Sequence, residues 1–118
     1  MTNTEKVAKH TNTLAGRLNR LVIGARRSAK VKGLLFDIDK EDVLACWLHQ
    51  NGKCLYTGWD MTTITGDLKL VSIERIDNSI GYLKNNFVLV CWCANRARNT
   101  LDFNFFVEMC TAISRKNK

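Results

Sequence analysis

The sequence predicts one α+β domain of 118 residues, in which a long basic helix precedes two short strands and further helices. Three observations lead to this class. Apolar residues near the N-terminus recur every three or four positions, two short runs rich in Val, Leu and Ile flank a turn, and proline is absent, which favours uninterrupted helices. The composition, 46% hydrophobic and 25% charged, is that of an ordinary globular protein.

The first predicted helix runs from Thr4 to about Lys30, and Gly33 follows as its stop signal. We therefore divide the chain into a basic helical arm, residues 1–33, and the domain that follows it, residues 34–118. The arm has an apolar face that must pack on the domain or on a second copy of the chain, which would give a homodimer through this helix. That face consists of Val7, Leu14, Leu18, Leu21, Val22 and Ala25.

Capping and turn residues divide the rest of the chain into short elements. Asp39 and Asp102 are the expected N-caps of two helices. The expected elements are a helix over residues 40–51, strands over 69–74 and 87–91, a helix over 94–100 and a last helix after residue 102. The last helix is expected to bury Phe103, Phe106, Val107, Cys110 and Ile113.

The charge of the chain favours a polyanionic partner, because the net charge is +7 and the pI is near 9.4. A solvated basic face would give the same composition. We expect double-stranded DNA, held mostly through its phosphates. The expected phosphate contacts are Arg17, Arg20, Arg26, Arg27, Lys30, Lys84, Arg96 and Arg98.

Membrane insertion and export are not expected. No apolar run approaches the roughly 20 residues that a membrane-spanning helix needs. The N-terminus lacks the basic-then-apolar pattern of a signal peptide. Five cysteines, an odd number, in a chain without that pattern favour reduced thiols and a cytoplasmic location.

One stretch carries residues suited to chemistry: Ser72-Ile73-Glu74-Arg75-Ile76-Asp77, followed by Asn86 and then by Asn95 on a short basic helix. Two strands joined by a loop and followed by a helix can bring a strand-end carboxylate close to a helical amide. Magnesium keeps most of its waters and binds few protein oxygens together with substrate phosphates. Glu74 and Asn95 are therefore enough for a weak metal site that the substrate completes.

The pattern resembles the HNH endonucleases of the ββα-metal (His-Me finger) superfamily, in the form common among phage-borne and homing-type nucleases. The resemblance covers roughly residues 35–110. It implies a small ββα-metal core and a DNA endonuclease that hydrolyses phosphodiester bonds, by nicking or double-strand cutting, with Mg²⁺ or Mn²⁺ as cofactor. A phage-encoded chain would act in the host cytoplasm. The matching residues are Gly52-Lys53-Cys54-Leu55-Tyr56-Thr57-Gly58, Ser72-Ile73-Glu74-Arg75-Ile76-Asp77, Gly81-Tyr82, Asn85-Asn86-Phe87-Val88, Cys91 and Asn95.

The resemblance also implies a role for each motif residue. Glu74 aligns with the acid that binds the metal, and Asn95 aligns with the metal ligand on the helix. Asn99, one turn later, aligns with a position that some members use as a further ligand. Asn86 aligns with the asparagine that holds the loop and orients the base. Asn86 could instead simply cap a turn, and Asn99 could simply end a helix.

Arg75 departs from the family pattern, because it stands where the family has its general-base histidine. A guanidinium keeps its proton in proteins and cannot be that base, although it can hold a phosphate and stabilise its developing charge. Loss of a positioned base typically lowers the rate by about 10²–10⁴. Three interpretations stay open: an active nuclease with an atypical arginine, an inactive module on the same fold that binds DNA or a host protein, and an unrelated small basic protein.

No other residue is an obvious replacement for the histidine. His49 is interpreted as a surface side chain at a helix end, and Asp77 as a turn cap, with water activation as its alternative role. Many relatives also bind a structural zinc through two Cys-x-x-Cys pairs. No structural zinc is expected here, because Cys54 has no second cysteine three residues later and Cys91 and Cys93 have the wrong spacing.

Overall fold

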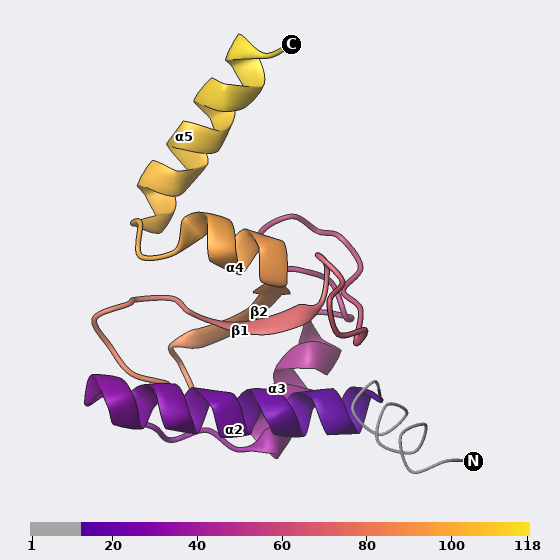
Figure 1. The fold of residues 1–118 in the computed structure, drawn as a ribbon, viewed down its shortest axis with the longest axis vertical. Helices are drawn as coiled ribbons and strands as arrows, with labels where there is room; N and C mark the ends of the chain where they lie inside the picture. Colours follow the sequence, from indigo (N-terminus) through magenta and orange to yellow (C-terminus); the bar gives the residue numbers. More distant parts are fainter. Residues whose placement is uncertain (1–12) are drawn as a thin grey trace.

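The structure, a computed structural model, describes residues 13–118 and confirms the α+β class (Figure 1). The expected helix start at Thr4 lies outside the described residues. In Figure 1, α2 and α3 lie on one side of the two-stranded sheet and α4 on the other, while α5 projects from the body. The elements are α2 (Leu14–Lys32), α3 (Lys40–His49), β1 (Val71–Arg75), β2 (Phe87–Cys91), α4 (Trp92–Arg98) and α5 (Phe103–Lys116).

Helix α2 is bounded by local signals and docks on its own chain. The Thr13 hydroxyl accepts a hydrogen bond from the Gly16 amide at 3.0 Å, and Gly33 ends the helix in the left-handed conformation with φ 68°. The face that contacts β1 and α3 comprises the buried residues Leu18, Val22, Ala25 and Ala29. These side chains belong to the same core cluster as both strands. Gly33 therefore ends a helix without separating two cores.

Of the two partners expected for the apolar face of α2, its own chain covers that face in the described residues. Leu18 is 2% exposed and Ala29 is 1% exposed, because the rest of the same chain covers them. A second copy cannot use a face that is already buried. Val7, which was expected on this face, lies outside the part of the chain that the structure describes.

Helix α3 is fixed at both ends. Asp39 and Asp42 form a reciprocal capping box, in which each carboxylate accepts a hydrogen bond from the other residue's amide, at 2.9 and 3.0 Å. At the far end, the Gln50 side chain donates to the carbonyl of Leu89 and accepts from its amide, at 2.8 and 3.0 Å. The helix is thereby tied to the outer edge of β2, and it ends at His49 rather than at residue 51.

The sheet is an antiparallel pair in which Glu74 faces Val88 and Arg75 faces Phe87. β1 begins at Val71 and includes Arg75, so it is shifted along the chain from the predicted strand. The first four residues of β1 are all buried because helices cover both faces of the sheet. β2 is a continuous apolar run, whereas β1 alternates apolar and polar residues and buries the polar side chains of Ser72 and Glu74.

Helix α5 begins where expected but does not bury its expected face. The Asp102 carboxylate caps the helix by accepting from the Phe105 amide at 3.3 Å. Of the five apolar side chains expected in the core, only Phe106 is buried. Exposure reaches 38% for Phe103, 45% for Val107 and 55% for Ile113. The amphipathic pattern was correct, but α5 leaves the body and has no second layer beneath it (Figure 1).

We expect the close packing of Gly81 against the backbone of Leu35 to be sensitive to one added methyl group. A Cβ on Gly81 would lie 2.1 Å from the Leu35 carbonyl oxygen and 2.7 Å from the Leu35 nitrogen, where the Tyr82 amide donates to that carbonyl at 2.9 Å. Gly81→Ala should lower the free energy of unfolding in urea by about 3 kcal/mol.

Gly24→Ala is the matched control, because a Cβ there meets nothing within 4 Å. It should raise the free energy of unfolding by about 0.5–1 kcal/mol, as alanine does in a helix interior. Equal stability of the Gly81→Ala variant and the natural chain would contradict the packing described here.

Candidate functional site

A polar hollow of about 350 Å³ lies where the end of β1 meets α4. It brings together Glu74, Arg75, Asn95 and Asn99, which were predicted from four positions spread over 26 residues of sequence. Asn86 does not line this hollow. The hollow is the place in the described residues where the predicted metal ligands share a solvent-accessible space.

Glu74 supplies a buried carboxylate to the hollow. Its residue is 4% exposed, and its Oε2 atom has no hydrogen-bond partner. The nearest cation is the Arg98 guanidinium, with Nη1 3.6 Å from Oε2, which is too long for a hydrogen bond. Burial raises the pKa of Glu74, while the charges of Arg98 and Arg75 oppose that rise. A carboxylate oxygen left in this state is a suitable ligand for a cation.

Asn95 faces the hollow with its amide in a defined orientation. Its Nδ2 atom donates to the Ser72 hydroxyl at 2.7 Å and to the Ile73 carbonyl at 3.0 Å. A carbonyl only accepts, so the atom that faces β1 must be the nitrogen. Both Nδ2 hydrogens are then engaged, while Oδ1 accepts no hydrogen bond from the described residues. α4 starts directly after β2, which fixes this asparagine one turn from the sheet.

Asn99 and Asn86 have different surroundings. Asn99 is exposed at the end of α4, with φ 51°, and lines the hollow at its margin. Asn86 is 6% exposed and holds the loop between the strands. Its Oδ1 accepts from the Asp77 amide at 3.0 Å, and its Nδ2 donates to the carbonyls of Asp77 and Gly81 at 3.1 and 2.9 Å. Asn86 therefore shapes the loop that carries the wall of the hollow.

Arg75 braces the same loop. Its Nη1 donates to the carbonyl of Asn78 at 2.6 Å and to that of Ile80 at 3.4 Å, and its guanidinium lies 5.4 Å from the centre of the Tyr82 ring. These contacts leave Nε and Nη2 for other partners. The predicted contact between Arg75 and a phosphate stays a prediction, which these two nitrogens would have to make.

Arg98 was predicted to contact DNA, and its burial shows that this is wrong. Arg98 is 3% exposed, so its guanidinium is not available to a phosphate on the outside. It acts as an internal brace between α4, the end of β1 and the start of α5. Its nitrogens donate, at 2.8–3.2 Å, to the carbonyls of Leu101, Arg75 and Ile76 and to the hydroxyl of Tyr56.

The other predicted phosphate contacts are more accessible. Arg17 is half-buried, because its Nε and Nη2 atoms donate to the Val71 carbonyl at 3.3 and 3.0 Å. The Lys84 ammonium lies 3.8 Å from the Asp42 carboxylate. The exposed members of the predicted set are Arg20, Arg26, Arg27, Lys30, Lys84 and Arg96.

Lys32 is a residue that the sequence did not single out. It is the last residue of α2, and it lines the hollow with Glu74 and Asn95. Sequence reasoning counted it only as one of many cations in the arm. The position of Lys32 depends on how α2 crosses the sheet, and no local pattern in the sequence encodes that crossing.

Neither alternative base lines the hollow. His49 is exposed at the end of α3. Asp77 accepts hydrogen bonds from the Ser79 hydroxyl and amide, at 2.6 and 2.9 Å, which lower its pKa and make it a turn cap. The cysteines are free thiols, and burial raises the pKa of Cys91 to about 12. Within residues 13–118, no group of three or more His, Cys, Asp or Glu side chains could hold a metal ion.

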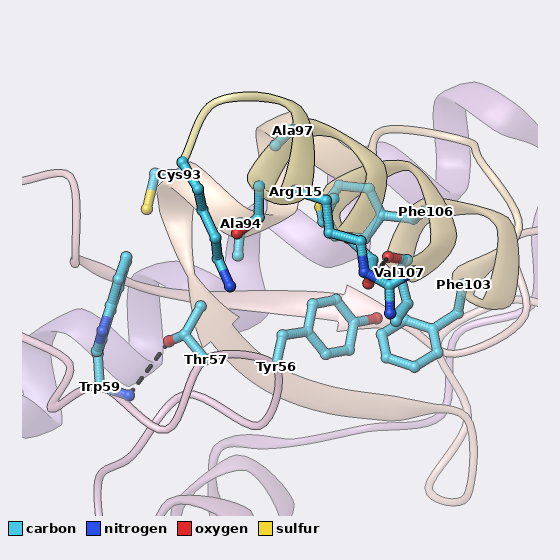
Figure 2. A pocket seen from close by; sticks show the side chains of 14 residues that line it. Tyr56, Thr57, Trp59, Cys93, Ala94, Ala97, Phe103, Phe106, Val107 and Arg115 are labelled. Carbon is cyan, nitrogen blue, oxygen red and sulfur yellow. Dashed lines mark hydrogen bonds between the residues drawn. The ribbon is translucent and has the colours of Figure 1, made fainter.

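A larger hollow, of about 590 Å³, lies between α5, α4 and residues 56–59 (Figure 2). Figure 2 shows the rings of Tyr56 and Phe103 next to each other, with centroids 4.7 Å apart. Phe106 and Val107 complete its apolar wall, and no Asp or Glu lines it. This hollow offers no carboxylate to a hard cation, whereas the smaller one contains Glu74.

Comparisons with known proteins add little about function. No protein-family model matches the chain, and no solved structure matches it. A stretch of 42 residues, 36% of the chain, is 40% identical to an uncharacterised protein of Acanthamoeba polyphaga mimivirus. The match spans only 8% of that protein's length. In the described part of the chain, no helix combines the length and the apolar character that crossing a bilayer requires.

We expect Arg98 to be a major determinant of stability. Arg98→Met would leave the buried Glu74 carboxylate without its neighbouring cation and would remove the donors of several interior acceptors. The free energy of unfolding in urea should fall by about 3–5 kcal/mol.

Arg96→Met is the control on the same helix. Arg96 is exposed and stacks on Trp92 at 5.3 Å, so its loss should lower the free energy of unfolding by less than about 1 kcal/mol. If the two variants unfold at the same urea concentration, Arg98 is not the internal brace described above.

Proposed function

We propose that the chain is a divalent-metal-dependent DNA endonuclease of the HNH type, with an atypical arginine at the general-base position. One observation carries the proposal. The buried Glu74 Oε2 has no hydrogen-bond partner, and Glu74 lines the same polar hollow as Asn95, whose amide nitrogen is fully engaged by β1. A carboxylate oxygen and an amide oxygen are then available to one space, as a weak magnesium site requires.

The donor set fits Mg²⁺ or Mn²⁺ better than it fits zinc. Glu74 and Asn95 would hold the ion, and Asn99 at the margin of the hollow would be a further ligand. All three offer oxygen atoms, which hard cations prefer, and no thiol or imidazole lines the hollow. When bound, such an ion supplies Lewis-acid stabilisation of the charge on a phosphate.

The chain's own residues would position the phosphodiester. Lys32, Arg75 and Arg96 place positive charge at the hollow from three elements, α2, β1 and α4. Cations so placed can orient a phosphate through charge-assisted hydrogen bonds. Asn86 holds the loop that carries the Arg75 contacts. No histidine lines the hollow, so we expect cleavage to be slower, by about 10²–10⁴, than with a positioned base.

The second candidate function is a catalytically inactive module on the same fold that binds DNA or a host protein. Two observations favour it. The Arg98 guanidinium already lies 3.6 Å from Glu74 Oε2, and it balances part of the charge that a metal would balance. Arg75 is hydrogen-bonded to its own loop. In that case, exposed cations such as Arg20 and Arg96 would give affinity for DNA without cleavage.

We expect the chain to nick supercoiled plasmid only with added Mg²⁺ or Mn²⁺. Glu74→Gln should lower the rate of nicking by about 10² or more, because a metal ion stabilises the transition state by several kcal/mol. The substitution keeps the size of the side chain, and the Arg98 guanidinium keeps its hydrogen bonds to Tyr56 and to the carbonyls of Arg75 and Ile76. The variant should therefore fold, with a lower free energy of unfolding than the natural chain because the buried Arg98 loses its neighbouring carboxylate. Glu108→Gln, on exposed α5, is the matched control and should cut like the natural chain. Plasmid that is bound but never cut with any divalent metal would establish the inactive module instead.

The pH dependence of metal binding should report the environment of Glu74. Burial raises the pKa of Glu74, so the folded state binds the carboxyl proton more tightly than the unfolded state does. The stability that the neutral carboxyl contributes is therefore lost as the pH rises through the pKa of Glu74 in the folded state. A cation needs the ionised form. The Mn²⁺-induced rise in Tm should therefore reach its full size above that pKa. On acidification, the rise should disappear at a higher pH than it would for a site built on an ordinary glutamate.

Thermal unfolding with and without Mn²⁺ across pH measures this effect. Glu74→Gln should show no Mn²⁺-induced shift at any pH, while Glu108→Gln should behave like the natural chain. A shift that survives in the Glu74→Gln variant would place the metal elsewhere.

A further inference from the structure

A second polar hollow, of about 260 Å³, lies between α2 and β1. Ile73 and Tyr82 line both this hollow and the one that contains Glu74 and Asn95, so the two are neighbours on the surface. The second hollow has two cations in its lining, Arg17 and Arg20, and no acidic residue. Its charge therefore suits an anion.

The two arginines are held near each other without an acidic partner. Arg17 is anchored by Nε and Nη2, which both donate to the Val71 carbonyl, while its Nη1 makes no hydrogen bond with the described residues. Burial and the neighbouring charge of Arg20 lower the pKa of Arg17. Two like charges in a part-buried hollow are unfavourable alone, and a bound anion would relieve their repulsion.

Ser72 connects the second hollow to the candidate metal ligand. Its Oγ atom accepts a hydrogen bond from Asn95 Nδ2 at 2.7 Å, so its hydroxyl proton is free to donate to another acceptor. Ser72 is 9% exposed and lines the second hollow. An anion there would be one hydroxyl group away from the asparagine of the first hollow.

Gly24 keeps the second hollow open. It lies within α2 and lines the hollow, and a Cβ on it would meet nothing within 4 Å. Glycine in a helix interior costs about 1 kcal/mol relative to alanine, and packing does not require a glycine here.

We propose that the second hollow binds a phosphate of the same DNA strand next to the phosphate in the Glu74–Asn95 hollow. The strand then runs across Ile73 and Tyr82 from the first hollow to α2. This inference rests on the proposed function for the identity of the first phosphate. In this proposal Arg17 and Arg20 contact one particular phosphate, in contrast to the general attraction that every exposed cation exerts on DNA.

The test compares two variants of the full chain that lose the same charge from the same helix. Arg20→Gln removes a cation from the second hollow, while Arg27→Gln removes an exposed cation that lines neither hollow. Binding to a fluorescent DNA duplex is measured by anisotropy in EDTA at several salt concentrations. Arg20→Gln should weaken binding about tenfold and lower the salt slope by about 1. Arg27→Gln, which loses only the general attraction of an exposed cation for phosphate, should weaken binding about twofold.

A third variant tests space rather than charge. Gly24→Met fills the hollow and keeps the net charge, and it should lower affinity about as much as Arg20→Gln while raising stability. If Arg20→Gln and Arg27→Gln bind DNA equally, or if Gly24→Met binds like the natural chain, the second hollow is not a phosphate site.

Cleavage separates this result from the proposed function. If the natural chain nicks plasmid and Arg20→Gln and Arg27→Gln bind DNA equally, the proposed nuclease is supported and the second phosphate site is contradicted. If nothing is ever cut but Arg20→Gln alone binds weakly, the phosphate site stands on an inactive module. Where cutting occurs, one phosphate beside the mapped cut can be replaced by a neutral methylphosphonate. The natural chain should bind this duplex about tenfold more weakly than the unmodified duplex, while the affinity of Arg20→Gln should not change. Equal sensitivity of both proteins would overturn the assignment.

Discussion

The buried guanidinium of Arg98 is the contact on which the arrangement of the candidate site depends. It joins α4 to the carbonyls of Arg75 and Ile76 at the end of β1, and it also reaches Tyr56 and the start of α5. A planar group with five donors can satisfy several acceptors in different directions, which a lysine ammonium could not do in the same geometry. The two elements that carry Glu74 and Asn95 are therefore held together by a rigid polar contact.

The same contact leaves the charge of Glu74 only partly balanced. At 3.6 Å, the Arg98 nitrogen attracts the carboxylate but does not satisfy Oε2, which has no hydrogen bond. A buried polar atom without a partner costs about 1–3 kcal/mol, and a purely structural ion pair would be expected to avoid that cost by closing the distance. Arg98 meanwhile makes good hydrogen bonds to its other acceptors. The unsatisfied atom is thus on the carboxylate alone, and Glu74 lines the hollow that also contains Asn95, which favours the proposed nuclease over the inactive module.

Local chemistry made much of the fold predictable, and long-range packing explains the rest. The caps at Asp39 and Asp102 and the stop at Gly33 follow from residues within a few positions, so the sequence was sufficient. Arg96 and Arg98 look alike in the sequence, yet one is exposed and the other is 3% exposed, because only the helix direction relative to β1 distinguishes them. The exposed face of α5 has the same origin: periodicity predicts an apolar face, but not whether another layer covers it.

The predicted site residues follow the same division. Glu74, Asn95 and Asn99 line one hollow, as expected, because the motif fixes a strand, a loop and a helix in a short stretch of chain; their role as metal ligands stays a prediction. Lys32 was missed because α2 lies outside that motif and meets it only in three dimensions. α2 lines both hollows, with Lys32 in the first and Arg17 and Arg20 in the second. The basic helix is therefore a wall of the site rather than an appended arm, and its charges act where the strand-end carboxylate lies. Since a weak metal site of two oxygen ligands needs the substrate to complete it, the element that holds the substrate phosphates would also determine how well the metal is held.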